Sequence, residues 1–315
     1  MTKRVVGFVA GLLAAAVAGV WLFGERGRLL LPSTREALRV GGWRGILNGS
    51  ALHGYVYARW SNQYLRLLIH TILPRLSPEG KQRLADRYHA KVLTPDQAEA
   101  IVTLDQPIPL QDLEQIVPYP VARDLVLAGP PDVAVYECGC RHSRDNGCKP
   151  TQVCMVVGQP IVDFVLEHNP QSARRLTQAE ALQLLREEHE RGHLHSAWFK
   201  DAILDRFYVL CNCCSCCCLG ITGMMQHGMR FMAPSGYVAQ VDEELCAACA
   251  ACEEACPFDA IQVDGRAVVR WEDCMGCGVC VGQCPNGAIS LVRDEGKGLP
   301  LDVRLLAQPA VSQGG

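Results

Sequence analysis

The sequence CAACAACEEACP occupies residues 246–257, and CMGCGVCVGQCP repeats its spacing at residues 274–285. Each copy has the form Cys-x2-Cys-x2-Cys-x3-Cys-Pro. Two residues between successive thiols let one tight loop wrap a metal cluster with three of them, while the fourth thiol has turned away. Zinc sites built from Cys-x2-Cys pairs explain neither the third cysteine nor the proline of each copy. The repeat therefore predicts two iron–sulfur sites.

The residues around the two copies predict short strands. Ala260–Val263 and Ala267–Val269 flank Asp264-Gly265, a pair typical of a two-residue hairpin turn, and Ala288–Val292 gives a further strand. Shared metal ligation would let this segment, residues 236–293, fold around its metal with little apolar core.

This pattern resembles the bacterial ferredoxins that carry two [4Fe-4S] clusters. The resemblance implies crossed ligation. One cluster would be held by Cys246, Cys249, Cys252 and Cys284, and the other by Cys274, Cys277, Cys280 and Cys256. The first loop departs from the pattern, because Ala248 stands where the second loop has Gly276. Hydrogen bonding and exposure set reduction potentials, so we expect the two clusters to differ.

Ten further cysteines lie upstream of the repeat and are candidate metal ligands: Cys138, Cys140, Cys148, Cys154, Cys211, Cys213, Cys214, Cys216, Cys217 and Cys218. Their Cys-x-Cys-Arg and Cys-Asn-Cys-Cys-x-Cys-Cys-Cys blocks resemble those of long 4Fe-4S binding proteins of anaerobic bacteria, over nearly the whole chain. Ten thiols could hold two cubanes, one cubane with a zinc ion, or a larger cluster; buried free thiols are the alternative. We expect at least one additional centre, with iron–sulfur preferred to zinc.

Two short apolar segments, which we expect to be strands, lead into these cysteine blocks: Asp132–Tyr136 before the first and Phe207–Leu210 before the second. We therefore expect the two blocks to converge in space. Arg141 lies within the first block, where it could form a structural ion pair or offset the charge of thiolates.

Composition excludes several classes of protein. The chain has 315 residues, 49% of them hydrophobic and 20% charged, with a formal net charge of −3. It has no basic excess for binding nucleic acid, and it is too apolar for a disordered scaffold. All 18 cysteines lie between Cys138 and Cys284, many in adjacent runs that suit metal better than disulfides.

The segment Val5–Phe23 contains no charged residue. Its length fits a membrane-spanning helix; a cleaved signal peptide and a buried core helix are the alternatives. More basic residues follow this segment than precede it, so the positive-inside rule predicts a single-pass membrane protein with its body on the cytoplasmic face.

The expected fold is α+β, in five parts. Residues 1–28 form the transmembrane anchor, and residues 29–130 form a helical region that packs on the body or lies on the membrane surface. This region includes short helices over 107–117 and 120–128. Elsewhere, Ser77 is expected to cap a helix, and Thr94 and Thr177 are each expected to open a helix with a capping box. A mostly helical cysteine-rich domain spans residues 131–235, the two-cluster module spans 236–293, and a tail spans 294–315.

The expected function is electron transfer by a membrane-anchored iron–sulfur protein between redox partner proteins. One alternative is a reductase or activase with an open-site cluster in the 138–218 block, fed by the two-cluster module. The other is a redox or metal sensor, or an assembly factor.

Overall fold

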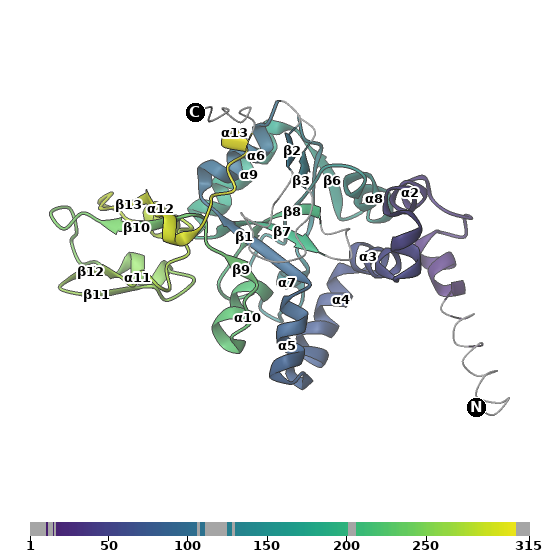
Figure 1. The fold of residues 1–315 in the computed structure, drawn as a ribbon, viewed down its shortest axis with the longest axis horizontal. Helices are drawn as coiled ribbons and strands as arrows, with labels where there is room; N and C mark the ends of the chain where they lie inside the picture. The colour runs from purple at the N-terminus through teal and green to yellow at the C-terminus, as the bar shows by residue number, and fades with distance from the viewer. Residues whose placement is uncertain are drawn as a thin grey trace, which may run out of the picture.

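A seven-stranded mixed sheet forms the centre of the protein in the computed structural model (Figure 1). The structure describes residues 11, 15, 17–105, 108–110, 125–127, 130–200 and 206–306. The strand order is β6-β4-β5-β8-β7-β1-β9, and every pair is antiparallel except β1 with β9. The strands are β1 (Tyr88–Leu93), β4 (Val133–Glu137), β5 (Gln152–Val157), β6 (Ala173–Leu176), β7 (Leu194–Lys200), β8 (Arg206–Cys213) and β9 (Met232–Ala233).

The expectation of a mostly helical middle domain is wrong, because this sheet runs through it. The strands β4 and β8 were expected from their apolar segments. The remaining strands were not, because β1 pairs with β7 across about a hundred residues of chain, and all seven residues of β7 are buried. A strand that is buried on both faces lacks the alternation of apolar and polar residues that identifies a strand in sequence.

Both faces of the sheet are covered. Along β4, Val133 and Val135 face the cluster of apolar side chains under α6 (Pro95–Thr103) and α9 (Gln178–Glu190). The alternate residues Ala134 and Tyr136 belong to a larger apolar cluster on the opposite face. The helices that contribute to this cluster or lie beside it are α3 (Ser50–Arg59), α4 (Ser61–Leu67), α5 (Pro78–Ala85), α7 (Gly139–His142), α8 (Ile161–His168) and α10 (Leu219–His227).

The predicted capping residues begin their helices. Thr94 and Thr177 each form a full capping box, with Gln97 and Glu180 as the reciprocal partners, at the starts of α6 and α9. Ser77 caps α5 by accepting a hydrogen bond from the backbone N–H of Gly80. These caps can be predicted from sequence because each depends only on residues within one helical turn.

The expectation of short helices at 107–117 and 120–128 is wrong for the described residues, which form strands. Ile108–Leu110 (β2) and Leu125–Leu127 (β3) pair as antiparallel strands. Residues 106–107, 111–124 and 128–129 lie outside the described residues.

The expected single-pass topology is contradicted by the helices of the structure. Within the residues that the structure describes, no helix is long and apolar enough to cross a bilayer. Of the apolar segment 5–23, residues 5–10, 12–14 and 16 lie outside the described residues. The expectations of a transmembrane anchor and of a single-pass membrane protein are therefore wrong.

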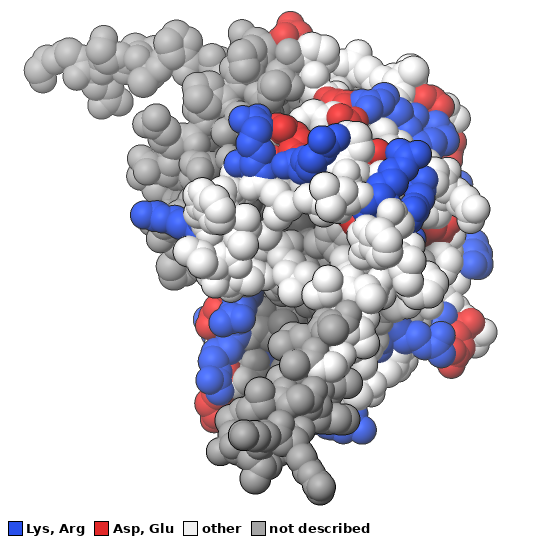
Figure 2. Space-filling view, turned by 90° about the vertical axis from the view of Figure 1, so that its right-hand side faces the viewer, with Lys and Arg blue, Asp and Glu red and all other residues white. Residues whose placement is uncertain are grey.

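From Val20 onward the chain packs on the body through helical segments, which belong to the main fold. These are η1 (Val20–Gly24), α2 (Pro32–Leu47), η2 (Leu68–Ile72) and η3 (Leu73–Arg75), with α3 and α4 between them. Leu65, Leu68 and Ile69 are buried in the larger apolar cluster. On the side of α2 and α8, charged side chains gather around a largely uncharged surface (Figure 2).

The C-terminal module projects from one side of the sheet (left in Figure 1). Its elements are β10 (Tyr237–Val241), α11 (Ala251–Ala255), β11 (Ile261–Asp264), β12 (Arg266–Val269), α12 (Val279–Gln283) and β13 (Ile289–Arg293). The expected hairpin with the Asp264-Gly265 turn is present as β11 and β12, and β13 pairs with β10. After η6 (Glu295–Lys297), the chain returns to the body, where α13 (Val303–Leu306) contacts α6.

Candidate metal centres

Two thiol-lined cavities lie within the C-terminal module, each with a volume of about 320 Å³. Four of the repeat cysteines line each cavity. The outer cavity contains Cys246, Cys249, Cys252 and Cys284, and the inner cavity contains Cys256, Cys274, Cys277 and Cys280. The fourth cysteine of each copy therefore lies beside the first three of the other copy.

Backbone N–H groups point at the sulfurs of both cavities. Ala267 and Ala288 donate to Cys246 and Cys284 in the outer cavity, at 3.4 and 3.3 Å. Ala260 and Ala239 donate to Cys256 and Cys274 in the inner cavity, at 3.2 and 3.5 Å. Such donors stabilise the negative charge on thiolates, which is what iron–sulfur ligation requires.

The two metal-binding loops share a left-handed backbone but differ in the residue that adopts it. Gly276 has φ 64°, and a Cβ there would overlap the carbonyl oxygen of Tyr237 and the hydroxyl of Ser235. At the equivalent position of the first loop, Ala248 has φ 52°. The departure noted in the sequence is therefore accommodated at the cost of an unfavourable backbone conformation.

The two cavities differ in exposure. Cys249 is exposed and Cys246 half-buried in the outer cavity, whereas Cys274, Cys277 and Cys280 are all buried in the inner one. The inner loop faces the body, where Ser235 binds the carbonyl oxygens of Met275 and Gly276 at 3.0 and 2.7 Å. The module therefore has one solvent-facing site and one site against the main sheet.

The family model of the 4Fe-4S binding domain matches the chain twice, at residues 239–262 and 267–290. No curated protein and no solved structure matches the chain significantly. Residues 239–290 thus form a ferredoxin-like two-cluster module for 4Fe-4S clusters, and the geometry of the thiols fits that cofactor. The chain is an iron–sulfur electron-transfer protein.

A larger cavity, of about 540 Å³, lies under the main sheet. The two upstream cysteine blocks converge there, as the sequence led us to expect. Six of its lining residues interact as a continuous series of thiols, and the last pair, Cys213 and Cys218, has its sulfurs 3.2 Å apart. In order of contact the series is Cys140, Cys138, Cys154, Cys211, Cys213 and Cys218. We call this site the six-thiol cavity.

Tyrosines enclose one side of the six-thiol cavity. Tyr57, Tyr88 and Tyr136 line it, and the hydroxyls of Tyr57 and Tyr208 lie 2.8 Å apart. Burial raises the pKa of Tyr88 and of Tyr136 well above the ordinary value, so both hydroxyls keep their protons. The cavity wall is therefore aromatic and uncharged on this side.

Arg141 provides a positive charge at the cavity wall. Its guanidinium pairs with the buried carboxylate of Glu188 at 2.6 Å and donates to the carbonyl oxygen of Asn212 at 3.2 Å. Burial alone would lower the pKa of Arg141, but the bond to Glu188 and the charge of that carboxylate raise it above the ordinary value. Arg141 is thus a structural ion-pair partner, and its charge also acts on Cys138.

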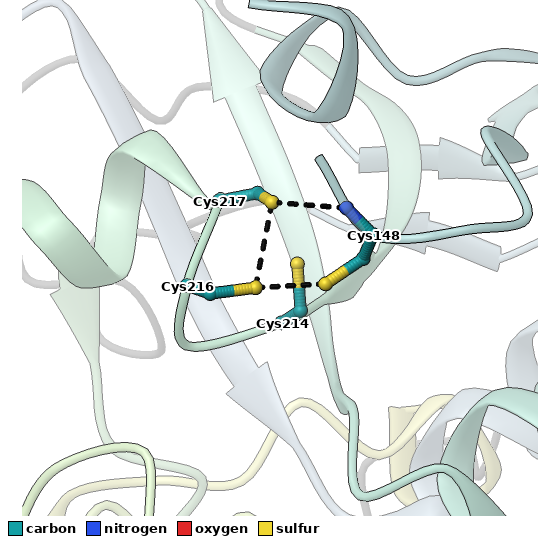
Figure 3. Close-up of side chains that lie close together, drawn as sticks. All are labelled: Cys148, Cys214, Cys216 and Cys217. Carbon is teal, nitrogen blue, oxygen red and sulfur yellow. Dashed lines mark hydrogen bonds between the residues drawn. The ribbon is translucent and has the colours of Figure 1, made fainter. Parts of the chain in front are cut away.

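The remaining four upstream cysteines form a second group beside this series, and two of them, Cys214 and Cys217, also line the larger cavity. The sulfurs of Cys148, Cys214, Cys216 and Cys217 all lie within 4.8 Å of one another and point toward a common centre (Figure 3). The sequence did not reveal this division of ten cysteines into six and four. Alternation along β8 places Cys211 and Cys213 on one side of the strand, but the turn after β8 decides which of the later thiols join them.

Proposed function

We propose that the chain passes electrons between a soluble redox partner and a metal centre in the six-thiol cavity, by way of the two-cluster module. A bound [4Fe-4S] cluster supplies reversible one-electron transfer. The proposal places the outer four cysteines at the entry point and the inner four next to the body. The fold would hold the three sites in a fixed sequence along the electron path: the outer cavity, the inner cavity and the six-thiol cavity.

The observation that carries this proposal is a shared core. Cys277 and Met275 of the inner loop belong to the same apolar cluster as Cys138, Cys154 and Cys213 of the six-thiol cavity. Phe258 and Val279 of the module are buried in that cluster as well. Close packing of this kind holds two sites at a fixed separation and excludes water between them.

The size and lining of the six-thiol cavity support an additional iron–sulfur centre. Its volume, about 540 Å³, exceeds the 320 Å³ of each ferredoxin cavity. Eight cysteines line it, and the six that form the continuous series already exceed what one zinc ion can bind. A cluster of cubane size or larger fits these two observations better than zinc does.

The charge around the outer cavity favours a partner with a basic surface. Glu244, Glu253 and Glu254 are exposed beside the outer loop, which carries the exposed Cys249, whereas the charge of the nearby Glu243 is paired with Arg266. A positive partner would be steered to this end of the module, at a rate that falls as salt increases.

Iron and acid-labile sulfide counts on anaerobically purified protein, with EPR after dithionite reduction, test this function. We expect more than about 8 iron atoms per chain, because two cubanes account for only 8. Cys138→Ser and Cys213→Ser should remove the excess iron and leave the ferredoxin signals. Cys249→Ser is the matched control, and it should perturb the ferredoxin signals alone. A wild-type chain with only 8 iron atoms and unchanged spectra in Cys138→Ser would overturn the proposal.

A further inference from the structure

We infer that Cys148, Cys214, Cys216 and Cys217 bind a single zinc ion, with ligands distinct from those of every iron–sulfur centre of the chain. This metal site follows from the positions of the four sulfurs and does not depend on the proposed electron route. We call these four residues the thiol tetrad.

The spacing of the sulfurs selects a mononuclear metal. All four lie within 4.8 Å of one another, and the sulfurs of Cys216 and Cys217 are 3.4 Å apart. A tetrahedral zinc ion with bonds of about 2.3 Å places its sulfur ligands roughly 3.8 Å apart. A cubane has irons and sulfides between its four thiolates, so it would hold them farther apart than the tetrad allows.

Two chain segments come together to make the tetrad. Cys148 belongs to the loop between α7 and β5, whereas the other three cysteines belong to the turn between β8 and α10. The backbone N–H of Cys148 donates to the sulfur of Cys217 at 3.4 Å, and the close-up shows all four side chains converging (Figure 3). A donor to a ligand sulfur is typical of thiolate metal sites.

Four thiolates and no other ligand type favour zinc over the harder divalent ions, because soft ligands select zinc, copper or iron–sulfur centres. Binding would release the thiol protons and leave a net charge of −2. The positive charge of Arg141 acts on Cys214, so part of this charge is offset within the protein.

The site would fasten the wall of the six-thiol cavity. The turn that carries Cys214, Cys216 and Cys217 lies between Cys213 and Cys218, which line the cavity. Cys214 and Cys217 line it as well, so the tetrad borders the cavity directly. The loop that carries Cys148 likewise lies between Cys140 and Cys154. A zinc ion that joins the two segments would fix the separation of the cavity thiols on either side.

A disulfide is the competing arrangement, because the sulfurs of Cys148 and Cys216 are 2.7 Å apart. That distance exceeds an S–S bond length of about 2.05 Å. A disulfide would also leave Cys214 and Cys217 without a reason to converge on the same point.

Zinc and iron counts on the full chain, purified anaerobically, test the inference together with zinc K-edge X-ray absorption. We expect about one zinc per chain with four sulfur neighbours at about 2.3 Å. Cys148→Ser and Cys216→Ser should each lower zinc to below about 0.2 per chain while the ferredoxin EPR signals persist. The matched control is Cys154→Ser, which removes a thiol of the six-thiol cavity and should keep the zinc.

Several results would overturn the inference. These are a wild-type chain without zinc, a single iron at this site, a loss of about four iron atoms in Cys216→Ser, or a Cys148–Cys216 disulfide found by peptide mass spectrometry. The absorption spectrum of the wild type decides the matter even if a variant does not fold. Failure of the proposed electron route would instead appear as unchanged iron in Cys138→Ser, so the two failures are distinguishable.

Discussion

The guanidinium of Arg141 and the carboxylate of Glu188 lie 2.6 Å apart, with side chains that are 1% and 0% exposed. Glu188 also accepts from Arg191 at 2.9 Å and lies 2.7 Å from His193. The pair thus fixes α9 to the wall of the six-thiol cavity. Because both charges are fully desolvated, each depends on the other far more than a surface pair would.

Glu188→Ala should therefore destabilise the protein by about 3 kcal/mol or more, since it leaves the buried charge of Arg141 uncompensated. Urea denaturation of the anaerobic protein, followed by circular dichroism, measures this loss. Arg174→Ala removes the exposed pair between Arg174 and Glu180 and should cost less than about 1 kcal/mol. Equal losses in the two variants would show that burial of the first pair has no energetic consequence.

Gly276→Ala should empty the inner cavity of iron. The added methyl group would overlap Tyr237 and Ser235, and the φ of 64° is unfavourable for alanine. Gly265→Ala is the matched control, because Gly265 has φ 70° but nothing lies within 4 Å of its Cβ position. Iron analysis should find about 4 fewer iron atoms in Gly276→Ala and no loss in Gly265→Ala. Full iron content in both variants would contradict this account of the loop.

Ala248→Gly should strengthen iron retention in the outer cavity, whereas Gly276→Ala weakens it in the inner one. Ala248 has φ 52°, a conformation that glycine adopts without steric cost. We expect the free energy of unfolding to rise by up to about 1 kcal/mol. The outer cavity should also lose its iron to a chelator more slowly than in the wild type. If Ala248→Gly loses its outer-cavity iron faster than the wild type, the methyl group has a packing role that outweighs its strain.

The stability of the protein should fall as the pH decreases from about 6.5 toward 4, and His168 should account for part of this loss. Burial lowers the pKa of His168 to about 4 in the folded chain, so the neutral ring is the folded form. Thr34 donates to Glu25 at 2.8 Å, and therefore accepts from Nε2 of His168 at 2.9 Å. Protonation of His168 would add a buried Nδ1–H that has no partner among the described residues.

The pKa of His168 in the unfolded and folded chain determines whether acid stabilises or destabilises the fold. The unfolded chain takes up a proton at His168 near pH 6.5, whereas the folded chain does so only near pH 4, so acid favours unfolding in that window. The loss should amount to about 1–3 kcal/mol by pH 4. Urea midpoints measured at pH 7.5, 6 and 5 for the wild type and His168→Gln should converge as the pH falls. Parallel curves for the two proteins would mean that another group carries the acid sensitivity.

Charge reversal at the outer loop should change the preference for electron acceptors. Glu253→Lys and Glu254→Lys remove negative charge beside the exposed Cys249. We expect the oxidation rate to fall several-fold with a cationic acceptor such as hexaamminecobalt(III), and to rise with ferricyanide. The difference should vanish at about 0.5 M salt. Glu79→Lys, in an exposed position on α5, is the control, and an equal effect there would locate electron exit away from the outer loop.

Local sequence signals predicted local structure. The capping boxes at Thr94 and Thr177 and the turn at Asp264-Gly265 lie where they were expected, because each depends on residues within a few positions. The central sheet was missed because its pairings join distant segments. Tyr88 lies opposite Lys200, for example, and no short window of sequence contains that pairing.

The metal sites were also predictable only in part: the grouping of the repeat cysteines was predicted, and that of the upstream cysteines was not. The resemblance of the repeat to two-cluster ferredoxins implied two groups of four cysteines, and the same groups of four line the two cavities of the module. The ten upstream cysteines have no such repeat. Their division into six and four depends on where the loop at Cys148 meets the turn at Cys216, which is a property of the folded chain. The apolar segment 5–23 was misleading in another way, because length and apolarity are necessary for a membrane span but not sufficient.

The six-thiol cavity also constrains how this protein can be assembled in a cell. Its wall includes Tyr57 and Leu65 from the early helices and Cys218 from a segment synthesised much later. The full set of thiols around this cavity is therefore available only after translation has passed Cys218. A cofactor held by both upstream cysteine blocks would then join segments that leave the ribosome far apart in time.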